Sequence, residues 1–125
     1  MLKILSGYRR RYSVQDIERE ILMMNANSSE RRDYALPIWT SESATHPMEL
    51  ENFFRQLWAA NAYTFPVRAP VPSFLLASAN DHFVNVSCSK TLADAWNCPL
   101  QIHPWAGHDL TLDDPEWVLE KLKQV

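Results

Sequence analysis

An aspartate and a histidine follow two apolar segments of the chain and could together perform acid–base chemistry. Asp81 follows "SFLLASA" (residues 73–79), and His108 follows "PLQIHPW" (residues 99–105). A carboxylate that binds one ring nitrogen of a histidine fixes its tautomer, and the other nitrogen can then accept a proton from a nucleophile. The two residues could therefore form the acid and base part of a Ser-His-Asp triad.

The apolar segments have the properties of two buried strands, since each is short and bounded by turn residues. The sequence between them, "SCSKTLADAWN" (residues 87–97), predicts a helix, and Asp114-Pro115 predicts the N-cap and first residue of a C-terminal helix. Two strands separated by one helix are expected to be parallel, with a right-handed crossover. Loops that follow parallel strands leave the same sheet edge, so Asp81 and His108 should meet there.

Two further helices are predicted in the first half of the chain. Residues 14–24 place apolar side chains on one helical face and follow a potential N-cap at Ser13. Residues 46–63 show the stronger periodicity, with Pro47 expected at the first helical position. Between these helices, polar residues and Pro37 predict a loop, and the proline-rich "TFPVRAPVPSF" predicts an extended linker. The apolar faces consist of Val14, Ile17, Ile21 and Met24 in the first helix and Leu50, Phe53, Phe54, Leu57 and Trp58 in the second.

The composition argues against several classes of protein. A chain of 125 residues with 46% apolar residues fits one globular unit, and a net charge of −3 argues against nucleic-acid binding. No segment approaches the roughly 18 apolar residues of a membrane span. The N-terminal apolar run is too short for a signal peptide. We therefore expect no membrane association and a cytoplasmic location.

The cysteines and glycines argue against other sites. Cys88 and Cys98 would lie at opposite ends of one helix, too far apart for a disulfide, and no Cys or His spacing indicates a metal site. With Gly7 and Gly107 as the only glycines, the chain has neither a P-loop nor a G-x-G-x-x-G dinucleotide site. We expect free thiols, no metal and no cofactor.

The second half of the chain resembles the C-terminal part of the α/β-hydrolase family. "PVPSFLLASANDHFVN" is similar to the strand and loop that carry the family's triad acid, and "HPWAGHDLTLDDPEW" is similar to the loop that carries its histidine and the following helix. The resemblance implies that Asp81 is the acid and His108 the base, in the family's order of nucleophile, acid and histidine. It also implies an α/β fold in one compact unit, with residues 1–65 as a helical cap-like segment and residues 66–125 as the C-terminal hydrolase segment.

The family's nucleophile is absent from these residues. A G-x-S-x-G elbow needs two glycines four positions apart, and Gly7 and Gly107 cannot provide them. Ser6 lacks the preceding glycine, and Cys88 fits a small apolar filler better than a reactive thiol. We therefore interpret the chain as a truncated or partial serine hydrolase, inactive or incomplete alone. Completed by an N-terminal half, it would act on a small-molecule ester or a related acyl compound.

Other aspartates could take the place of Asp81, and another histidine, His82, could be mistaken for the base. Asp109 lies next to His108, but a tight turn would point it elsewhere, and Asp113 follows a few residues later. Asp114 fits a helix N-cap better than a triad acid. His82, beside the candidate acid, fits an ordinary loop residue.

The aromatic residues of the first half permit two interpretations. They could line an acyl pocket in a cap, although aromatic residues at helical spacing are more often plain core. The candidate pocket residues are Trp39, Phe53, Phe54 and Trp58. A rival function is a non-catalytic interaction module derived from a hydrolase, in which these helices bind a partner. Two strands taken from a larger sheet would also leave exposed edges, which predicts self-association.

Overall fold

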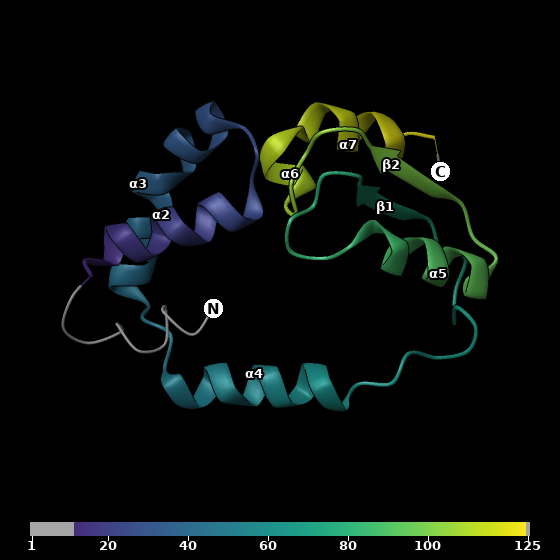
Figure 1. Cartoon of the computed structure of the whole chain (residues 1–125), viewed down its shortest axis with the longest axis horizontal. Coiled ribbons are helices and arrows are strands. Elements are labelled where there is room, and N and C mark those ends of the chain that lie inside the picture. Colours follow the sequence, from purple (N-terminus) through teal and green to yellow (C-terminus); the bar gives the residue numbers. More distant parts are fainter. Residues whose placement is uncertain (1–11, 125) are drawn as a thin grey trace.

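The computed structural model describes residues 12–124, so Ser6 and the N-terminal apolar run lie outside the described residues. Figure 1 shows a mixed α/β architecture, with a small parallel sheet and its helices in the second half of the chain and further helices beside them in the first half. The elements are α2 (Val14–Asn25), α3 (Ser29–Thr45), α4 (Leu50–Ala62), β1 (Leu75–Ser78), α5 (Val86–Trp96), β2 (Leu100–His103), α6 (Leu110–Asp113) and α7 (Pro115–Leu122).

The two strands pair in parallel, as the order of the predicted elements requires. Their register runs from Leu75 opposite Leu100 to Ser78 opposite His103, and the Ala79 N–H donates to the His103 carbonyl, 2.8 Å away, just beyond the last pair. Helix α5 connects the strands and packs against both of them. The predicted strand-helix-strand unit is therefore confirmed.

Side-chain caps mark the starts of α5 and α7. The Asn85 side chain accepts a hydrogen bond from the Ser87 N–H at the start of α5. The Asp114 side chain accepts from the Trp117 N–H, 3.0 Å away, and Pro115 is the first residue of α7, as predicted. One short helix, α6, was not predicted; the Asp109 side chain caps it.

Helices α2 and α3 pack against each other and form the other buried part of the chain. The Ser13–Asp16 capping box starts α2 at the predicted place. The predicted buried face is shifted: Val14 is exposed, whereas Leu22 and Glu18 are buried. Glu18 tolerates burial because the Ser43 hydroxyl of α3 donates to its carboxylate, 2.6 Å away.

The loop predicted around Pro37 is wrong, because this segment is the long helix α3. Ser28 caps the helix start by accepting from the Arg31 N–H, and α3 packs along α2. Proline removes one backbone donor, here the bond that would reach the Asp33 carbonyl. The cap and the contact with α2 outweigh this local loss.

Helix α4 forms in the segment of strongest periodicity but starts at Leu50, with Glu49 as its N-cap, rather than at Pro47. It lies apart from the other helices in Figure 1 and is joined to β1 by an extended proline-rich segment, as predicted. Its apolar face is largely uncovered, with Trp58 74% exposed and Phe54 58% exposed. No helix among residues 12–124 combines the length and the apolar character needed to cross a bilayer.

Candidate functional site

Asp81 and His108 meet beyond the C-terminal ends of the two strands. The Asp81 Oδ2 atom lies 2.9 Å from His108 Nδ1, although the residues are 27 positions apart in sequence. Asp81 belongs to the loop after β1, which we call the acid loop (residues 79–85), and His108 to the loop after β2, the histidine loop (residues 104–109). The contact expected from the parallel arrangement is therefore present.

The acid loop fixes the orientation of the Asp81 carboxylate. Oδ1 accepts hydrogen bonds from the backbone N–H groups of Phe83 and Val84, at 2.7 and 2.9 Å, which leaves Oδ2 directed at His108. Burial raises the pKa of Asp81, but the hydrogen bonds from Val84, His108 and Phe83 lower it more, so the pKa lies below its ordinary value. The carboxylate is thus held ionised beside the imidazole.

His108 presents its second nitrogen to the outside. Its side chain is 41% exposed, whereas that of Asp81 is 12% exposed. Within the described residues, Nε2 has no hydrogen-bond partner. When Nδ1 donates to the ionised carboxylate, Nε2 carries the free lone pair, so the arrangement can accept a proton from a group that approaches from solvent. The Phe83 ring lies 5.1 Å from the imidazole, centroid to centroid.

The histidine loop is held against the end of α2 by its backbone. The Gly107 N–H donates to Asp113 Oδ2, 2.5 Å away, and the Asp109 N–H donates to the Asn25 carbonyl, 2.8 Å away. A Cβ atom on Gly107 would lie 2.6 Å from the Asn25 carbonyl oxygen, so only glycine permits this close approach. The residues on both sides of His108 are therefore fixed to other parts of the fold.

A second histidine–carboxylate pair, His103 and Asp114, was missed by the sequence-based predictions. His103 Nε2 lies 3.2 Å from Asp114 Oδ2, and Nδ1 accepts from the Ala106 N–H at 2.9 Å. The His103 side chain is buried between Trp105 and Trp117, whose rings meet it edge-on. With both nitrogens bonded and no access from solvent, this histidine supports the histidine loop and cannot serve as a base. No local sequence signal distinguishes it.

The alternative acids have other roles in the structure. Asp109 caps α6, Asp114 caps α7, and Asp113 is buried and binds backbone N–H groups. Asp81 is thus the carboxylate that contacts His108 in the part of the chain the structure describes. His82 is an exposed residue of the acid loop, as expected.

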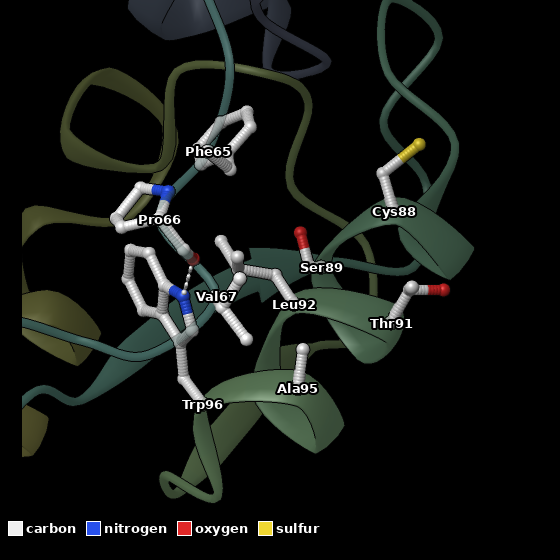
Figure 2. A pocket seen from close by; sticks show the side chains of 9 residues that line it. All are labelled: Phe65, Pro66, Val67, Cys88, Ser89, Thr91, Leu92, Ala95 and Trp96. Atoms are coloured by element: carbon white, nitrogen blue, oxygen red, sulfur yellow. Dashed lines mark hydrogen bonds between the residues drawn. The ribbon is translucent and has the colours of Figure 1, made fainter.

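The four residues predicted to line a substrate pocket do not line the apolar groove beside α5. Figure 2 shows this apolar groove between α5 and the segment before β1, closed on one side by the Trp96 indole, which donates to the Pro66 carbonyl 2.9 Å away. Its lining consists of Phe65, Pro66, Val67, Cys88, Ser89, Thr91, Leu92, Ala95 and Trp96. Trp39, Phe53, Phe54 and Trp58 are not among these residues; Trp39 lies on α3 and the other three on α4.

The described residues contain two cysteines, which bear on whether they hold a disulfide or a metal site. Cys88 and Cys98 are free thiols, as the sequence predicts, and Cys88 is exposed at the start of α5. Within residues 12–124, no group of three or more His, Cys, Asp or Glu side chains is arranged to hold a metal ion.

Comparison with known proteins identifies the family. A family model described as serine hydrolase matches residues 42–114, more than half of the chain, and this range contains both Asp81 and His108. The chain belongs to the serine hydrolase family. The putative carbamate hydrolase RutD of Caulobacter sp. (strain K31) is 45% identical to it over 51 residues. That match covers 40% of this chain and 18% of the relative's length.

A serine hydrolase needs a serine hydroxyl at the free nitrogen of its histidine. None of the serines in residues 12–124 hydrogen-bonds to either ring nitrogen of His108. Ser78, the described serine at the end of β1, is buried and donates instead to the Ala106 carbonyl of the histidine loop. The sequence contains no G-x-S-x-G motif, and within residues 12–124 no serine hydroxyl is hydrogen-bonded to the Asp81–His108 pair.

Proposed function

We propose that this chain is the C-terminal part of a serine hydrolase with the α/β-hydrolase fold, and that it contributes the acid Asp81 and the base His108. The observation that carries the proposal is the 2.9 Å contact between Asp81 Oδ2 and His108 Nδ1. This contact lies at the C-terminal edge of two parallel strands, where α/β enzymes place their reacting groups. The family match over both residues supports it.

The reaction would be hydrolysis of an ester or a related acyl bond. His108 Nε2 takes the proton of a serine hydroxyl as the serine oxygen attacks the acyl carbon, and Asp81 stabilises the imidazolium that forms. The proton then passes to the leaving group as its bond to the acyl carbon breaks. In the second half of the reaction, His108 takes a proton from a water molecule as its oxygen attacks the acyl carbon. The bond between the acyl carbon and the serine oxygen then breaks, which releases the carboxylic acid product and regenerates the serine hydroxyl. The serine and the oxyanion-hole donors would come from polypeptide outside these residues.

The proposal also assigns a role to the helical first half of the chain and to its aromatic residues. Residues 1–65 would form a helical cap and residues 66–125 the C-terminal hydrolase segment, together one compact unit. A small-molecule substrate of the ester class fits the proposed chemistry, and the name of the RutD relative, a putative carbamate hydrolase, describes cleavage of a related acyl bond. The aromatic residues of α3 and α4 would line its acyl pocket.

A non-catalytic interaction module is the second candidate function. The uncovered aromatic face of α4 favours it, because Phe54 and Trp58 project into solvent. In that case the Asp81–His108 pair would be inherited from an active ancestor without having a catalytic function, and the exposed face of α4 would bind another protein.

One experiment separates the two functions. First, the nucleotide sequence upstream of Met1 is read for an in-frame segment that encodes a strand, a G-x-S-x-G motif and a helix. The protein translated from that extended reading frame, which we call the longer product, is then assayed for ester hydrolysis. The assay compares it with its His108→Ala, Asp81→Asn and His82→Ala variants. We expect the motif, and we expect losses of about 10³-fold or more for the first two variants. His82→Ala, a change of an exposed neighbour, should stay within about two-fold of the parent. Absence of both the motif and ester hydrolysis would favour the interaction module.

A further inference from the structure

Asn27 lies at the corner between α2 and α3, and its side chain contacts both loops that carry the candidate pair. Its Nδ2 donates to the Asn80 carbonyl of the acid loop, 3.0 Å away, and to the Trp105 carbonyl of the histidine loop, 2.8 Å away. A side-chain amide has two hydrogens, so each carbonyl can receive one of them. Asn80 directly precedes Asp81. We infer that Asn27 is a positioning residue that sets the separation of the two loops, an inference that rests on the proposed function.

The corner that carries Asn27 is itself anchored. The Asn27 N–H donates to Asp113 Oδ2, 2.9 Å away, and the Ser28 N–H donates to Oδ1, 2.8 Å away. The same Oδ2 atom receives the Gly107 N–H. Because one buried carboxylate fixes both the corner and the residue before His108, the Asn27 side chain extends from a firm base. It reaches from there to the acid loop, which the Asp113 carboxylate does not bind.

The Asn27 bridge lies where the backbone pairing of the two strands ends. Backbone pairing between the strands ends with the bond from the Ala79 N–H to the His103 carbonyl. Beyond that point, within residues 12–124, no backbone hydrogen bond joins the acid loop to the histidine loop. Past the ladder, the Ser78 hydroxyl donates to the Ala106 carbonyl and accepts from the Asn80 N–H. The Asn27 side chain adds a second bridge, which holds the acid loop one residue before Asp81 and the histidine loop three residues before His108.

If Asn27 positions the two loops, the tautomer of the His108 ring should depend on Asn27. While the loops keep their separation, the Asp81 carboxylate holds the proton of neutral His108 on Nδ1. When the separation is free to vary, the imidazole is no longer confined to one tautomer. The state of the His108 ring thus reports the action of Asn27 without any catalytic turnover.

The test uses the 125-residue chain, labelled with ¹⁵N in its histidine rings, at a pH where the imidazole is neutral. In the parent, the His108 ring nitrogens should show one tautomer, protonated on Nδ1. Asn27→Ala removes both donors, and Asn27→Asp keeps the shape but cannot donate; both should give a mixture of tautomers while the helical circular dichroism is retained. Ser28→Ala is the matched control, because it removes the cap of α3 at the same corner and the Ser28 hydroxyl makes no hydrogen bond to either loop. It should retain the single tautomer.

Other outcomes decide against the inference. If folded Asn27→Ala and Asn27→Asp keep the parent's tautomer, Asn27 does not position the pair. If neither variant folds, the exchange of the Asn27 side-chain amide hydrogens in the parent decides: both should be protected, and exchange at the rate of a free amide would overturn the bridge. In the longer product, Asn27→Ala should lower kcat by about 10- to 100-fold with little change in KM. A longer product without hydrolase activity would refute the proposed function, while the tautomer result would still be readable.

Discussion

The Asp113 carboxylate binds the Gly107 backbone N–H at 2.5 Å, directly beside His108. The same side chain accepts from the Asn27 and Ser28 N–H groups, so one buried aspartate joins the α2–α3 corner to the histidine loop. The residue before His108 is therefore tied, through Asp113, to a corner of the chain that precedes it by 80 residues in sequence. The stability of the fold and the geometry of the site therefore depend on the same contacts.

Replacement of Asp113 should destabilise the chain strongly. Asp113→Ala leaves the buried Gly107 N–H and the part-buried Asn27 and Ser28 N–H groups without their acceptor. An unsatisfied buried donor costs about 1–3 kcal/mol, so we expect a loss of about 2 kcal/mol or more in the free energy of unfolding. Urea unfolding followed by circular dichroism measures it. Asp33→Ala, at an exposed position of α3, is the control and should change the free energy by less than about 0.5 kcal/mol. Equal stability of the two variants would contradict the anchoring role.

Gly107→Ala should destabilise the fold and displace His108. The added Cβ would lie 2.6 Å from the Asn25 carbonyl oxygen and 3.1 Å from Ala26 Cα, both backbone atoms that cannot rotate away. Overpacking of this kind costs about 1–3 kcal/mol. The measurement is the midpoint of urea unfolding together with the ¹⁵N shifts of the His108 ring. An unchanged midpoint and unchanged shifts would show that α2 does not approach Gly107 this closely.

Sequence reasoning found the candidate pair because its signals are local. Strand ends, turn residues and the Asp114-Pro115 cap are each contained within a few positions, and the parallel order of the strands then brings Asp81 to His108. Family resemblance added the roles of the two residues, and the family match covers both of them. The roles themselves remain a proposal.

The parts that sequence reasoning missed depend on contacts between distant segments. Pro37 indicated a loop, but packing of α3 on α2 keeps the helix continuous. Glu18 has a polar side chain and is nevertheless buried, because the Ser43 hydroxyl of another helix donates to it. The bridge formed by Asn27 spans 53 and 78 residues, and such a separation leaves no periodicity or motif that could reveal it.

The pH dependence of stability should include a contribution from Asp81. Burial raises its pKa, but hydrogen bonds from Val84, His108 and Phe83 lower it more, and these exist only in the folded chain. A carboxyl with a lowered folded pKa stabilises the fold above its unfolded pKa of about 3.9, and this stabilisation is lost as the pH falls through the lower folded value. The acid limb of the stability curve should therefore be shallower in Asp81→Asn than in the parent.

Urea unfolding at pH 7, 4 and 3 measures this difference. Some acid dependence should persist in Asp81→Asn, because the Ser13 hydroxyl lowers the pKa of Asp16 and the Trp117 N–H lowers that of Asp114. Asp94→Asn, which replaces an exposed carboxylate of α5, is the matched control for the loss of one acidic side chain. Identical slopes for Asp81→Asn and the parent would contradict the hydrogen bonds assigned to the Asp81 carboxylate.

The uncovered face of α4 should make the chain self-associate. Phe54 and Trp58 are 58% and 74% exposed on one helix, and adjacent apolar side chains of this size favour association in water. Sedimentation velocity over a range of concentrations should show dimers or larger species in the parent, and fewer of them in the double variant Phe54→Ser with Trp58→Ser. Tyr34→Ser, which removes an equally exposed aromatic residue from α3, should leave association unchanged. A monomeric parent at all concentrations would contradict the prediction.

Covalent labelling with a fluorophosphonate, located by mass spectrometry, tests most directly whether this chain holds the acid and base of a triad without its nucleophile. The reagent reacts with a serine whose hydroxyl is activated by a neighbouring general base, the role proposed for His108. We predict no label on residues 1–125 alone, and a single label on the G-x-S-x-G serine of the longer product that His108→Ala abolishes and His82→Ala does not. Stoichiometric labelling of Ser6 or any other serine of the 125-residue chain, or a label that survives His108→Ala, would contradict it.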